Sequence, residues 1–264
     1  MHHQPHPTAA SDDQYRTDAN LTSRITLHQH FSVNAIGWFR WLFDRLDLPA
    51  EARLLELGCG RGDLWFDNRD RLPTSWRLVL TDRSAGMATV SRRQLAASPV
   101  EVTIGVVDAR SLPFVPATFD AVVANHMLYH VPDRPAALAE IRRVLRSGGR
   151  LYAATNGRDH LRELDDLVRS VAPEAPGDDV AATFGLETGA AQLAARFGKV
   201  VRHDYPDALA VTEVAPVVAY LLSTAAAPLL DRPRLQRLRM TVAEAIARDG
   251  AFRITKSTGV LIAR

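Results

Sequence analysis

Three glycines at alternate positions, Gly58, Gly60 and Gly62, follow Glu56 at the end of a short apolar run. Glycine adopts positive φ without strain and leaves no Cβ in the path of a ligand that approaches the backbone. A dinucleotide-binding loop has its third glycine three residues after its second, where this chain has Asp63. A carboxylate in the first turn of the next helix would repel a pyrophosphate. The loop therefore suits a nucleoside without phosphate groups.

Two more carboxylates end the next apolar runs of the chain. Asp82 comes twenty residues after the last glycine of the loop, where a carboxylate can accept both hydroxyls of a ribose. Asp108 is followed by the small residue Ala109, so a carboxylate and a backbone N–H could read the amino edge of adenine there. Two such acids behind a glycine loop predict one nucleoside site at the carboxyl ends of adjacent strands.

The neighbours of these residues fit more than one role. Arg83 fits stacking on adenine and fits neutralisation of Asp82 equally well, and Met87 fits an adenine wall or the buried face of a helix. Cys59 is the only cysteine, which excludes an internal disulfide and leaves a reactive thiol open. No HExxH motif supports a metal-dependent mechanism, and we expect no metal.

Short apolar runs alternate with helical stretches through the middle of the chain. The runs cover residues 54–57, 77–82, 100–108, 119–125 and 149–156, with helices expected at 84–97 and 135–145. Right-handed crossovers place helices on both faces of a parallel sheet, so the alternation predicts a doubly wound α/β fold. Two late β-rich regions, 200–211 and 252–263, can pair antiparallel at the sheet edge.

The residues before this alternation predict different structure. Residues 1–11 are polar and aperiodic, so we expect a disordered tail. Apolar residues recur at helical spacing over 21–48, which predicts an amphipathic helix. The expected organisation is therefore a tail at 1–11, a helical cap or lid at 12–52, and the doubly wound domain at 53–264.

Over residues 53–156 the chain resembles the class I S-adenosylmethionine (SAM) dependent methyltransferases, particularly the small-molecule enzymes of the ubiquinone/menaquinone-biosynthesis type. The resemblance rests on LLELGCGRGDLW, LVLTDRSAGM, VVDARSLPF, FDAVVANHMLYHVPD and IRRVLRSGGRLYAATN, in that order and spacing. It implies a Rossmann-like, seven-stranded, mostly parallel sheet that ends in an antiparallel hairpin. It also implies SAM as the cofactor, S-adenosylhomocysteine (SAH) as its product, and a ligand lying across the carboxyl ends of the first four strands.

Carried over to this chain, the resemblance makes Glu56 and the first two glycines the methionine loop, Asp82 the ribose acid, and Asp108 with Ala109 the adenine readers. Asn125 and His126 match positions beside the sulfonium. The full set of expected cofactor-binding residues is Glu56, Gly58, Cys59, Gly60, Asp82, Arg83, Met87, Asp108, Ala109, Asn125 and His126.

Methyl transfer from a sulfonium is an in-line displacement, so holding the nucleophile close and aligned can supply much of the acceleration. A general base is optional, and a histidine suits the task for a hydroxyl or a protonated amine. His126 and His130 are the candidates, although His130 in its Tyr-His-Val-Pro-Asp run fits a bracing role better. Tyr15 in the N-terminal segment is a third candidate if that segment folds over the cofactor.

The composition of the chain limits the classes of molecule that we expect it to bind. The 264 residues are 47% hydrophobic and carry a formal net charge of only +2, so a sizeable core is expected and a polyanion surface is not. Asn125 is followed by His-Met-Leu, which lacks the Asn-Pro-Pro-Tyr pattern of nucleic-acid amino-methylation. We therefore expect a small-molecule methyl acceptor, no nucleic acid and no membrane partner. A homodimer is left open.

The N-terminus has no apolar core segment and no run of positive charge, so a cytoplasmic location is expected. Methyl transfer to an oxygen, a nitrogen or an activated carbon is the predicted function. Two alternatives stay open at this point: a nicotinamide-dependent oxidoreductase, which the glycine spacing opposes, and a SAM-binding protein that transfers no methyl group.

Overall fold

The computed structural model describes residues 26–177 and 180–264, and these divide into two compact units. The larger unit holds residues 38–158, 180–205 and 258–264, and it contains the predicted cofactor site. The smaller unit holds residues 26–37, 159–177 and 206–257. Tyr15, the predicted tail at 1–11 and the first part of the predicted cap at 12–52 lie outside the described residues.

The larger unit is built on a seven-stranded sheet with the order β3-β2-β1-β4-β5-β9-β6. The strands are β1 (Arg53–Leu57), β2 (Arg77–Asp82), β3 (Glu101–Val106), β4 (Phe119–Asn125), β5 (Leu145–Asn156), β6 (Val200–Asp204) and β9 (Thr258–Ala263). The first five pair in parallel, whereas β9 runs antiparallel to both β5 and β6. The predicted doubly wound sheet with an antiparallel C-terminal edge is confirmed.

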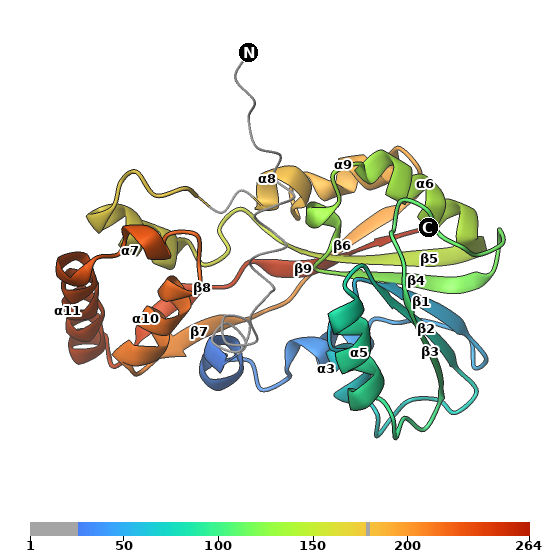
Figure 1. The fold of residues 1–264 in the computed structure, drawn as a ribbon, viewed down its shortest axis with the longest axis horizontal. Coiled ribbons are helices and arrows are strands. Elements are labelled where there is room, and N and C mark those ends of the chain that lie inside the picture. The colour runs from blue at the N-terminus through green and yellow to red at the C-terminus, as the bar shows by residue number, and fades with distance from the viewer. Residues whose placement is uncertain (1–25, 178–179) are drawn as a thin grey trace, which may run out of the picture. The chain divides into compact units, whose positions relative to one another are not determined.

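Helices of the larger unit cover both faces of this sheet (Figure 1). They are α3 (Trp38–Phe43), α4 (Asp63–Phe66), α5 (Ala85–Gln94), the 3₁₀ turn η1 (Leu128–His130), α6 (Arg134–Val144), α8 (Val180–Phe184) and α9 (Gly189–Ala194). The side chains of β1 alternate between two cores: Leu55 packs in the cluster that holds α6, and Leu54 packs in the cluster that holds Trp41 and Trp65. Burial on both faces is what a parallel sheet requires.

Local sequence signals fix where two of these helices begin. The Ser84 side chain accepts a hydrogen bond from the backbone N–H of Met87 at the start of α5. At the start of α6, the Asp133 side chain accepts from the N–H of Ala136, and Pro135 occupies the first turn. Both caps lie near the carboxyl ends of strands and so set the direction in which each helix leaves the site.

The predicted continuous helix over residues 21–48 is wrong within the described part. Residues 26–31 are helical, the chain leaves the helix at Ser32, and α3 begins only at Trp38. In the smaller unit, the Asp207 carboxylate accepts hydrogen bonds from the Ser32 hydroxyl at 2.7 Å and from the backbone N–H of Asn34 at 3.1 Å. These bonds replace the helical ones, which the apolar periodicity could not reveal.

The smaller unit packs helices on a two-stranded antiparallel sheet. It contains α7 (Arg162–Val171), β7 (Ala208–Val211), α10 (Val214–Leu222), the 3₁₀ turn η2 (Ala227–Leu229), α11 (Arg232–Asp249) and β8 (Phe252–Thr255). Each of the two late β-rich regions therefore forms two strands. One strand of each region, β6 or β9, joins the large sheet, and the other, β7 or β8, belongs to the two-stranded sheet. Pro206 stands at the first break, where proline cannot donate to a ladder. No helix in the described ranges is long and apolar enough to cross a membrane.

Candidate cofactor site

The glycine loop follows β1 and takes the conformation that its sequence predicts. Gly58, Gly60 and Gly62 have φ values of 64°, 54° and 83°, a region that other residues enter with strain. A Cβ on Gly58 would lie 2.7 Å from the Cβ of Met127, so the loop is packed against the chain that leaves β4. A Cβ on Gly60 would meet no atom within 4 Å. The loop thus presents bare backbone to open space at Gly60, which suits the close approach of a ligand.

Asp82 ties this loop to the end of β2. Its Oδ2 accepts a hydrogen bond from the backbone N–H of Gly60 at 2.9 Å, and its Oδ1 accepts from the N–H of Ser84 at 2.8 Å. The backbone N–H of Cys59 also donates to the carbonyl of Thr81 at 2.9 Å. Each carboxylate oxygen has a second lone pair, so the ribose role predicted for Asp82 is compatible with these bonds.

Glu56 lies behind the loop and is 1% exposed. Its Oε2 accepts a hydrogen bond from the Trp65 indole N–H at 2.6 Å. Burial raises the pKa of the Glu56 carboxyl to about 8, against a smaller lowering by the Trp65 hydrogen bond. A positively charged ligand group nearby would favour the ionised form, so this carboxyl suits the amino end of an amino acid.

Asp108 and Ala109 follow β3, next to the end of β2 in the sheet. The Asp108 carboxylate accepts from Arg110 at 2.6 Å, and hydrogen bonding to Arg110 lowers the pKa of the Asp108 carboxyl. Ala109 is buried, and no acceptor for its N–H lies within the described part of the chain. The carboxylate that could read an adenine amino group is therefore shared with Arg110, a pairing that we did not predict.

The remaining residues expected near adenosine differ in their solvent exposure. Arg83 is exposed and Met87 is half-buried at the start of α5. The positive charge of Arg83 contributes to lowering the pKa of the Asp108 carboxyl. Cys59 is 7% exposed, and burial raises the pKa of its thiol. A buried thiol held in its neutral form is a poor nucleophile, which argues against a reactive thiol at Cys59.

Asn125 and His126 lie at the end of β4, on the other side of β1. The Trp38 indole N–H donates to Oδ1 of Asn125 at 3.1 Å, and the Trp38 and His126 rings have centroids 5.2 Å apart. His126 has a φ of 53°, a strained value for a residue other than glycine. Such strain persists where the surroundings hold it, and it is common at functional sites.

Of the two other catalytic candidates, His130 and Tyr15, the structure describes only His130. His130 ends the η1 turn and is exposed, and its ring lies 4.5 Å from the ring of Tyr129. Tyr129 in turn has its ring centroid 6.4 Å from that of His126. Tyr15 lies outside the described residues. These contacts bring His126, Tyr129 and His130 together but assign none of them a role in catalysis.

Trp38, Trp65 and Arg110 touch predicted site residues and were not singled out from the sequence. Arg110 could have been found, since a cation two residues after a candidate acid is a local signal. Trp38 and Trp65 could not, because their partners Asn125 and Glu56 are brought to them only by folding. The sequence pattern does not indicate which acceptors their indole N–H groups will meet.

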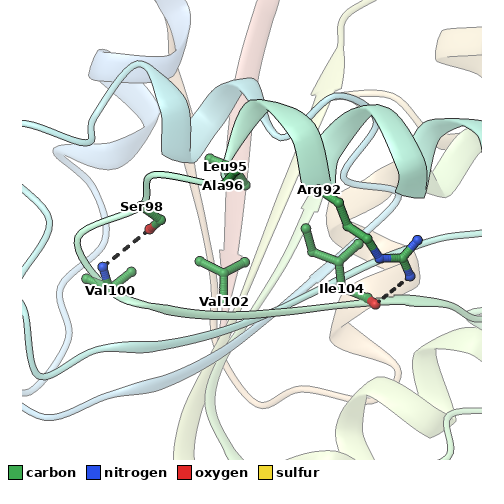
Figure 2. A pocket seen from close by; sticks show the side chains of 7 residues that line it. All are labelled: Arg92, Leu95, Ala96, Ser98, Val100, Val102 and Ile104. Carbon is green, nitrogen blue, oxygen red and sulfur yellow. Dashed lines mark hydrogen bonds between the residues drawn. The ribbon is translucent and has the colours of Figure 1, made fainter.

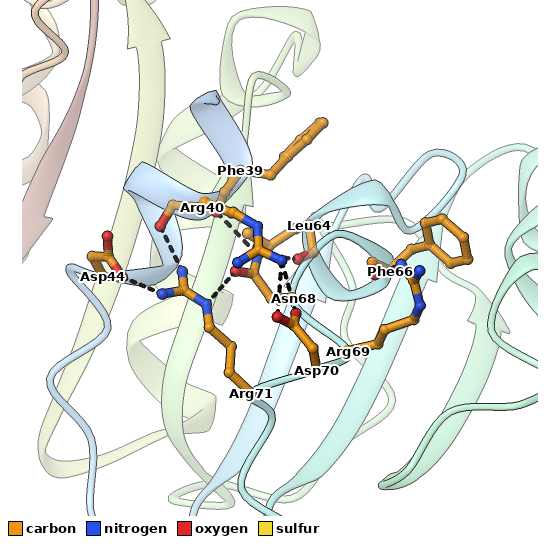
Figure 3. A network of polar contacts seen from close by, with 9 residues as sticks. All are labelled: Phe39, Arg40, Asp44, Leu64, Phe66, Asn68, Arg69, Asp70 and Arg71. Carbon is orange, nitrogen blue, oxygen red and sulfur yellow. Dashed lines mark hydrogen bonds and ion pairs between the residues drawn. The ribbon is translucent and has the colours of Figure 1, made fainter. Parts of the chain in front are cut away.

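A network of polar contacts joins α3, which begins with Trp38, to the end of α4 (Figure 3). The buried Asn68 amide donates to the carbonyls of Phe39 at 3.1 Å and Leu64 at 2.6 Å. Arg71 donates to the Arg40 carbonyl at 2.9 Å and pairs with Asp44 at 2.6 Å. The network therefore fixes α3 on the element that follows the glycine loop.

A separate pocket of about 310 Å³ lies between α5 and the edge strand β3 (Figure 2). The pocket is lined by Arg92, Leu95, Ala96, Ser98, Val100, Val102 and Ile104. None of these residues belongs to the predicted cofactor set. No group of three potential metal ligands occurs in the described ranges.

The fold and the loop define a class of domain: a doubly wound sheet whose first strand ends in a glycine loop for a ligand without phosphates, with acids at the ends of β2 and β3. Residues 55–153 match the family described as methyltransferase domain, so this segment of the chain is similar to that family. The resemblance to class I SAM-dependent methyltransferases is confirmed over this segment.

Named relatives agree with the family match. The demethylmenaquinone methyltransferase of Symbiobacterium thermophilum is 34% identical over 115 residues, which are 43% of this chain and 46% of that protein. The 27-O-demethylrifamycin SV methyltransferase of Amycolatopsis mediterranei is 38% identical over 144 residues, 53% of this chain and 47% of that protein. The matched part of the chain thus spans about half the length of these relatives.

A solved structure extends the likeness beyond the matched segment. The 4+2 cyclase SpnF has a TM-score of 0.53 and 20% identity, and the likeness covers 86% of this chain and 78% of that one. At this identity the likeness shows a common fold and nothing more.

Proposed function

We propose that this protein transfers the methyl group of SAM to an oxygen, a nitrogen or an activated carbon of a small organic molecule. The observation that carries the proposal is the hydrogen bond from the Gly60 N–H to Asp82. This bond joins the glycine loop, which suits a ligand without phosphate groups, to the carboxylate that we expect to bind the ribose. The methyltransferase domain match over residues 55–153 supports the same reaction.

SAM supplies an electrophilic methyl group on a sulfonium. Glu56 and the backbone of Gly58, Cys59 and Gly60 would hold its amino-acid end, and Asp82 would hold its ribose. Asp108 and Ala109 would read adenine, with Arg83 and Met87 beside them, and Asn125 and His126 would lie by the sulfonium. The order β3-β2-β1-β4 supports this assignment, because it places these groups in one line along the sheet.

His126 is the preferred proton acceptor if the methyl acceptor is a hydroxyl or an ammonium. Its ring lies against Trp38, and its strained backbone is held at the end of β4. His130 is exposed in the η1 turn and is the weaker candidate of the two histidines, and Tyr15, which lies outside the described residues, remains a candidate.

A small organic acceptor is supported by the two named relatives, which are a demethylmenaquinone methyltransferase and a 27-O-demethylrifamycin SV methyltransferase. The net charge of +2 favours such an acceptor over a nucleic acid. A cytoplasmic location and a homodimer belong to the same proposal and rest on sequence reasoning alone.

Titration calorimetry with SAM, SAH and NAD tests the cofactor assignment. We expect micromolar binding of SAM and SAH and no binding of NAD, because the loop lacks the third glycine of a dinucleotide site. NAD binding without SAM binding would favour the oxidoreductase. Transfer of labelled methyl from SAM to a panel of small phenols, quinols and amines then tests the reaction.

A SAM-binding protein without methyl transfer is the second candidate. The glycine loop and the acids at the ends of β2 and β3 would serve SAM binding equally well in such a protein. Binding of SAM with no transfer to any acceptor of the panel would support that candidate.

A further inference from the structure

The carboxyl end of β4 adjoins the glycine loop. Leu57 and Ala124 are register partners in the pair of β1 with β4, so the next residues, Gly58 and Asn125, are neighbours across the two strands. The close packing of Gly58 on Met127 agrees with this arrangement. A ligand whose amino-acid end lies along the glycine loop would therefore reach the Asn125 side chain.

The contact with Trp38 determines which way the Asn125 amide points. An indole N–H only donates, so the atom of Asn125 that faces it at 3.1 Å must be the amide oxygen. The Nδ2 group is then directed away from Trp38. Within residues 26–177 and 180–264, no acceptor bonds Nδ2 of Asn125. This atom is not fully buried, so a ligand can reach it. Asn125 therefore presents two N–H donors at this point of the site.

Trp38 itself is held from three directions. Its ring stacks on Trp41 with centroids 5.3 Å apart, and the Tyr205 ring meets it edge-on at 5.4 Å. The backbone of α3 is held by the Asn68 bond to the Phe39 carbonyl (Figure 3). A fixed donor costs little further entropy when it orients its partner.

We propose that Trp38 is a positioning residue that holds the Asn125 amide as a hydrogen-bond donor to the carboxylate of the amino-acid end of SAM and SAH. This inference rests on the proposed function. Trp38 touches no reacting atom and acts through Asn125. Without the indole N–H the amide can rotate, so its oxygen can face the ligand carboxylate and repel it.

The test compares SAH with 5′-methylthioadenosine, which lacks the amino-acid end, as ligands in titration calorimetry. Trp38→Phe keeps a ring and removes the N–H, and we expect it to weaken SAH binding about fivefold, as for loss of one hydrogen bond. Asn125→Ala should weaken SAH binding by a similar factor. Binding of 5′-methylthioadenosine should stay within twofold in both variants.

A double-mutant cycle separates positioning from independent packing effects. If Trp38 acts through Asn125, the double variant Trp38→Phe, Asn125→Ala should bind SAH about as weakly as Asn125→Ala alone. Trp76→Phe is the matched control, because the indole N–H of the buried Trp76 likewise donates a hydrogen bond, to the Pro49 carbonyl at 3.1 Å, away from the site. Its SAH affinity should equal that of the wild type.

The inference is overturned if the losses of SAH affinity in the two single variants multiply in the double variant. It is also overturned if the variants lose affinity for SAH and 5′-methylthioadenosine equally. If Trp38→Phe does not fold, Asn125→Asp decides, since it keeps an acceptor for the indole and replaces the donor by a negative oxygen. We expect at least a tenfold loss of SAH binding there, and unchanged affinity would overturn the inference. Wild-type protein that binds no SAH would overturn the proposed function as well, whereas wild-type binding with unaltered variants overturns this inference alone.

Discussion

The backbone N–H of Gly60 donates to Oδ2 of Asp82 at 2.9 Å, and this bond joins the loop after β1 to the end of β2. The same carboxylate accepts from the N–H of Ser84 through its other oxygen. One side chain thus holds the shape of the loop, orients the start of α5 and keeps lone pairs for a ligand. Substitution of Asp82 should therefore weaken ligand binding more than it lowers the stability of the sheet.

Asp82→Ala should weaken SAM binding at least tenfold, a loss of about 1.4 kcal/mol, because the ribose hydroxyls lose a charged acceptor. Titration calorimetry measures this change. Glu101→Ala is the matched control, since Glu101 is an exposed acid near the start of β3 with only a 3.5 Å contact to Arg77. Unchanged SAM affinity in folded Asp82→Ala would refute the ribose assignment.

Gly58→Ala and Gly60→Ala should separate folding from binding. Both positions have positive φ, but a Cβ at 58 would collide with Met127 at 2.7 Å, whereas one at 60 would meet open space. We expect Gly58→Ala to lose about 2 kcal/mol or more of unfolding free energy, because strain and a clash combine. Gly60→Ala should lose about 1 kcal/mol of stability and most of its SAM affinity.

Urea unfolding and SAM titration of both glycine variants check this prediction. Gly37→Ala serves as a control, because Gly37 does not have a positive φ and a Cβ there meets nothing within 4 Å. Equal stability of Gly58→Ala and Gly60→Ala would contradict the packing of the loop on Met127. Normal SAM affinity in Gly60→Ala would contradict the approach of a ligand to that backbone.

Much of the fold follows from local patterns. The apolar runs at 77–82 and 119–125 coincide with β2 and β4 because buried parallel strands need continuous apolar residues. Parallel strands put their carboxyl ends at one edge, so the proximity of the glycine loop and Asp82 was predictable as well. These inferences required only chain order and residue type.

Other features depend on contacts distant in sequence. Asn125 and Trp38 are 87 positions apart, and Ser32 and Asp207 are 175 apart. The first contact completes the site and the second ends a helix that the apolar spacing predicts to continue. A periodic pattern records which face of a segment is buried, but it does not identify the polar partner that folding brings to it.

Glu56→Gln should change stability in a pH-dependent way. Burial raises the pKa of the Glu56 carboxyl from 4.5 to about 8, so the group favours folding fully below pH 4.5 and loses that contribution as the pH rises through 8. Glutamine is neutral throughout and still accepts from Trp65. We expect equal melting temperatures at pH 4.5 and a higher one for the variant at pH 9.

Thermal unfolding of the protein without ligand at these two pH values measures the effect. Glu51→Gln is the control, because Glu51 is exposed before β1. If the wild type melts above Glu56→Gln at pH 9, the carboxylate is stabilised in its charged form and the direction of the pKa shift is wrong.

His126→Ala should slow turnover more than it weakens SAM binding if the imidazole accepts a proton from the methyl acceptor. Alanine at a φ of 53° adds strain, so His126→Asn is the better variant, since asparagine tolerates this region. We expect its SAH affinity to stay within threefold and its kcat to fall by about a hundredfold. A wild-type pH profile that is flat from pH 6 to 9 would remove His126 from proton transfer.

Asp207→Asn should destabilise the smaller unit. The Asp207 carboxylate bonds the Lys256 ammonium at 2.5 Å, with the two side chains 0% and 8% exposed, and it also accepts from Ser32 and Asn34. Removing one charge of a buried pair costs about 3 to 5 kcal/mol. We expect a loss of this order in urea unfolding at pH 7, and a much smaller loss when Lys256→Met is added.

The loss should also depend on pH. Burial alone would raise the pKa of Asp207, but hydrogen bonds from Lys256 and Ser32 outweigh it and hold the pKa below the usual value of 3.8. A lowered pKa means that the charge stabilises the fold above pH 3.8 and loses this effect as the pH falls through the folded-state value. The difference between wild type and Asp207→Asn should therefore shrink below that value. A difference that stays constant from pH 7 to pH 2 would mean that the hydrogen-bond geometry of Asp207, rather than its charge, anchors residues 32–34.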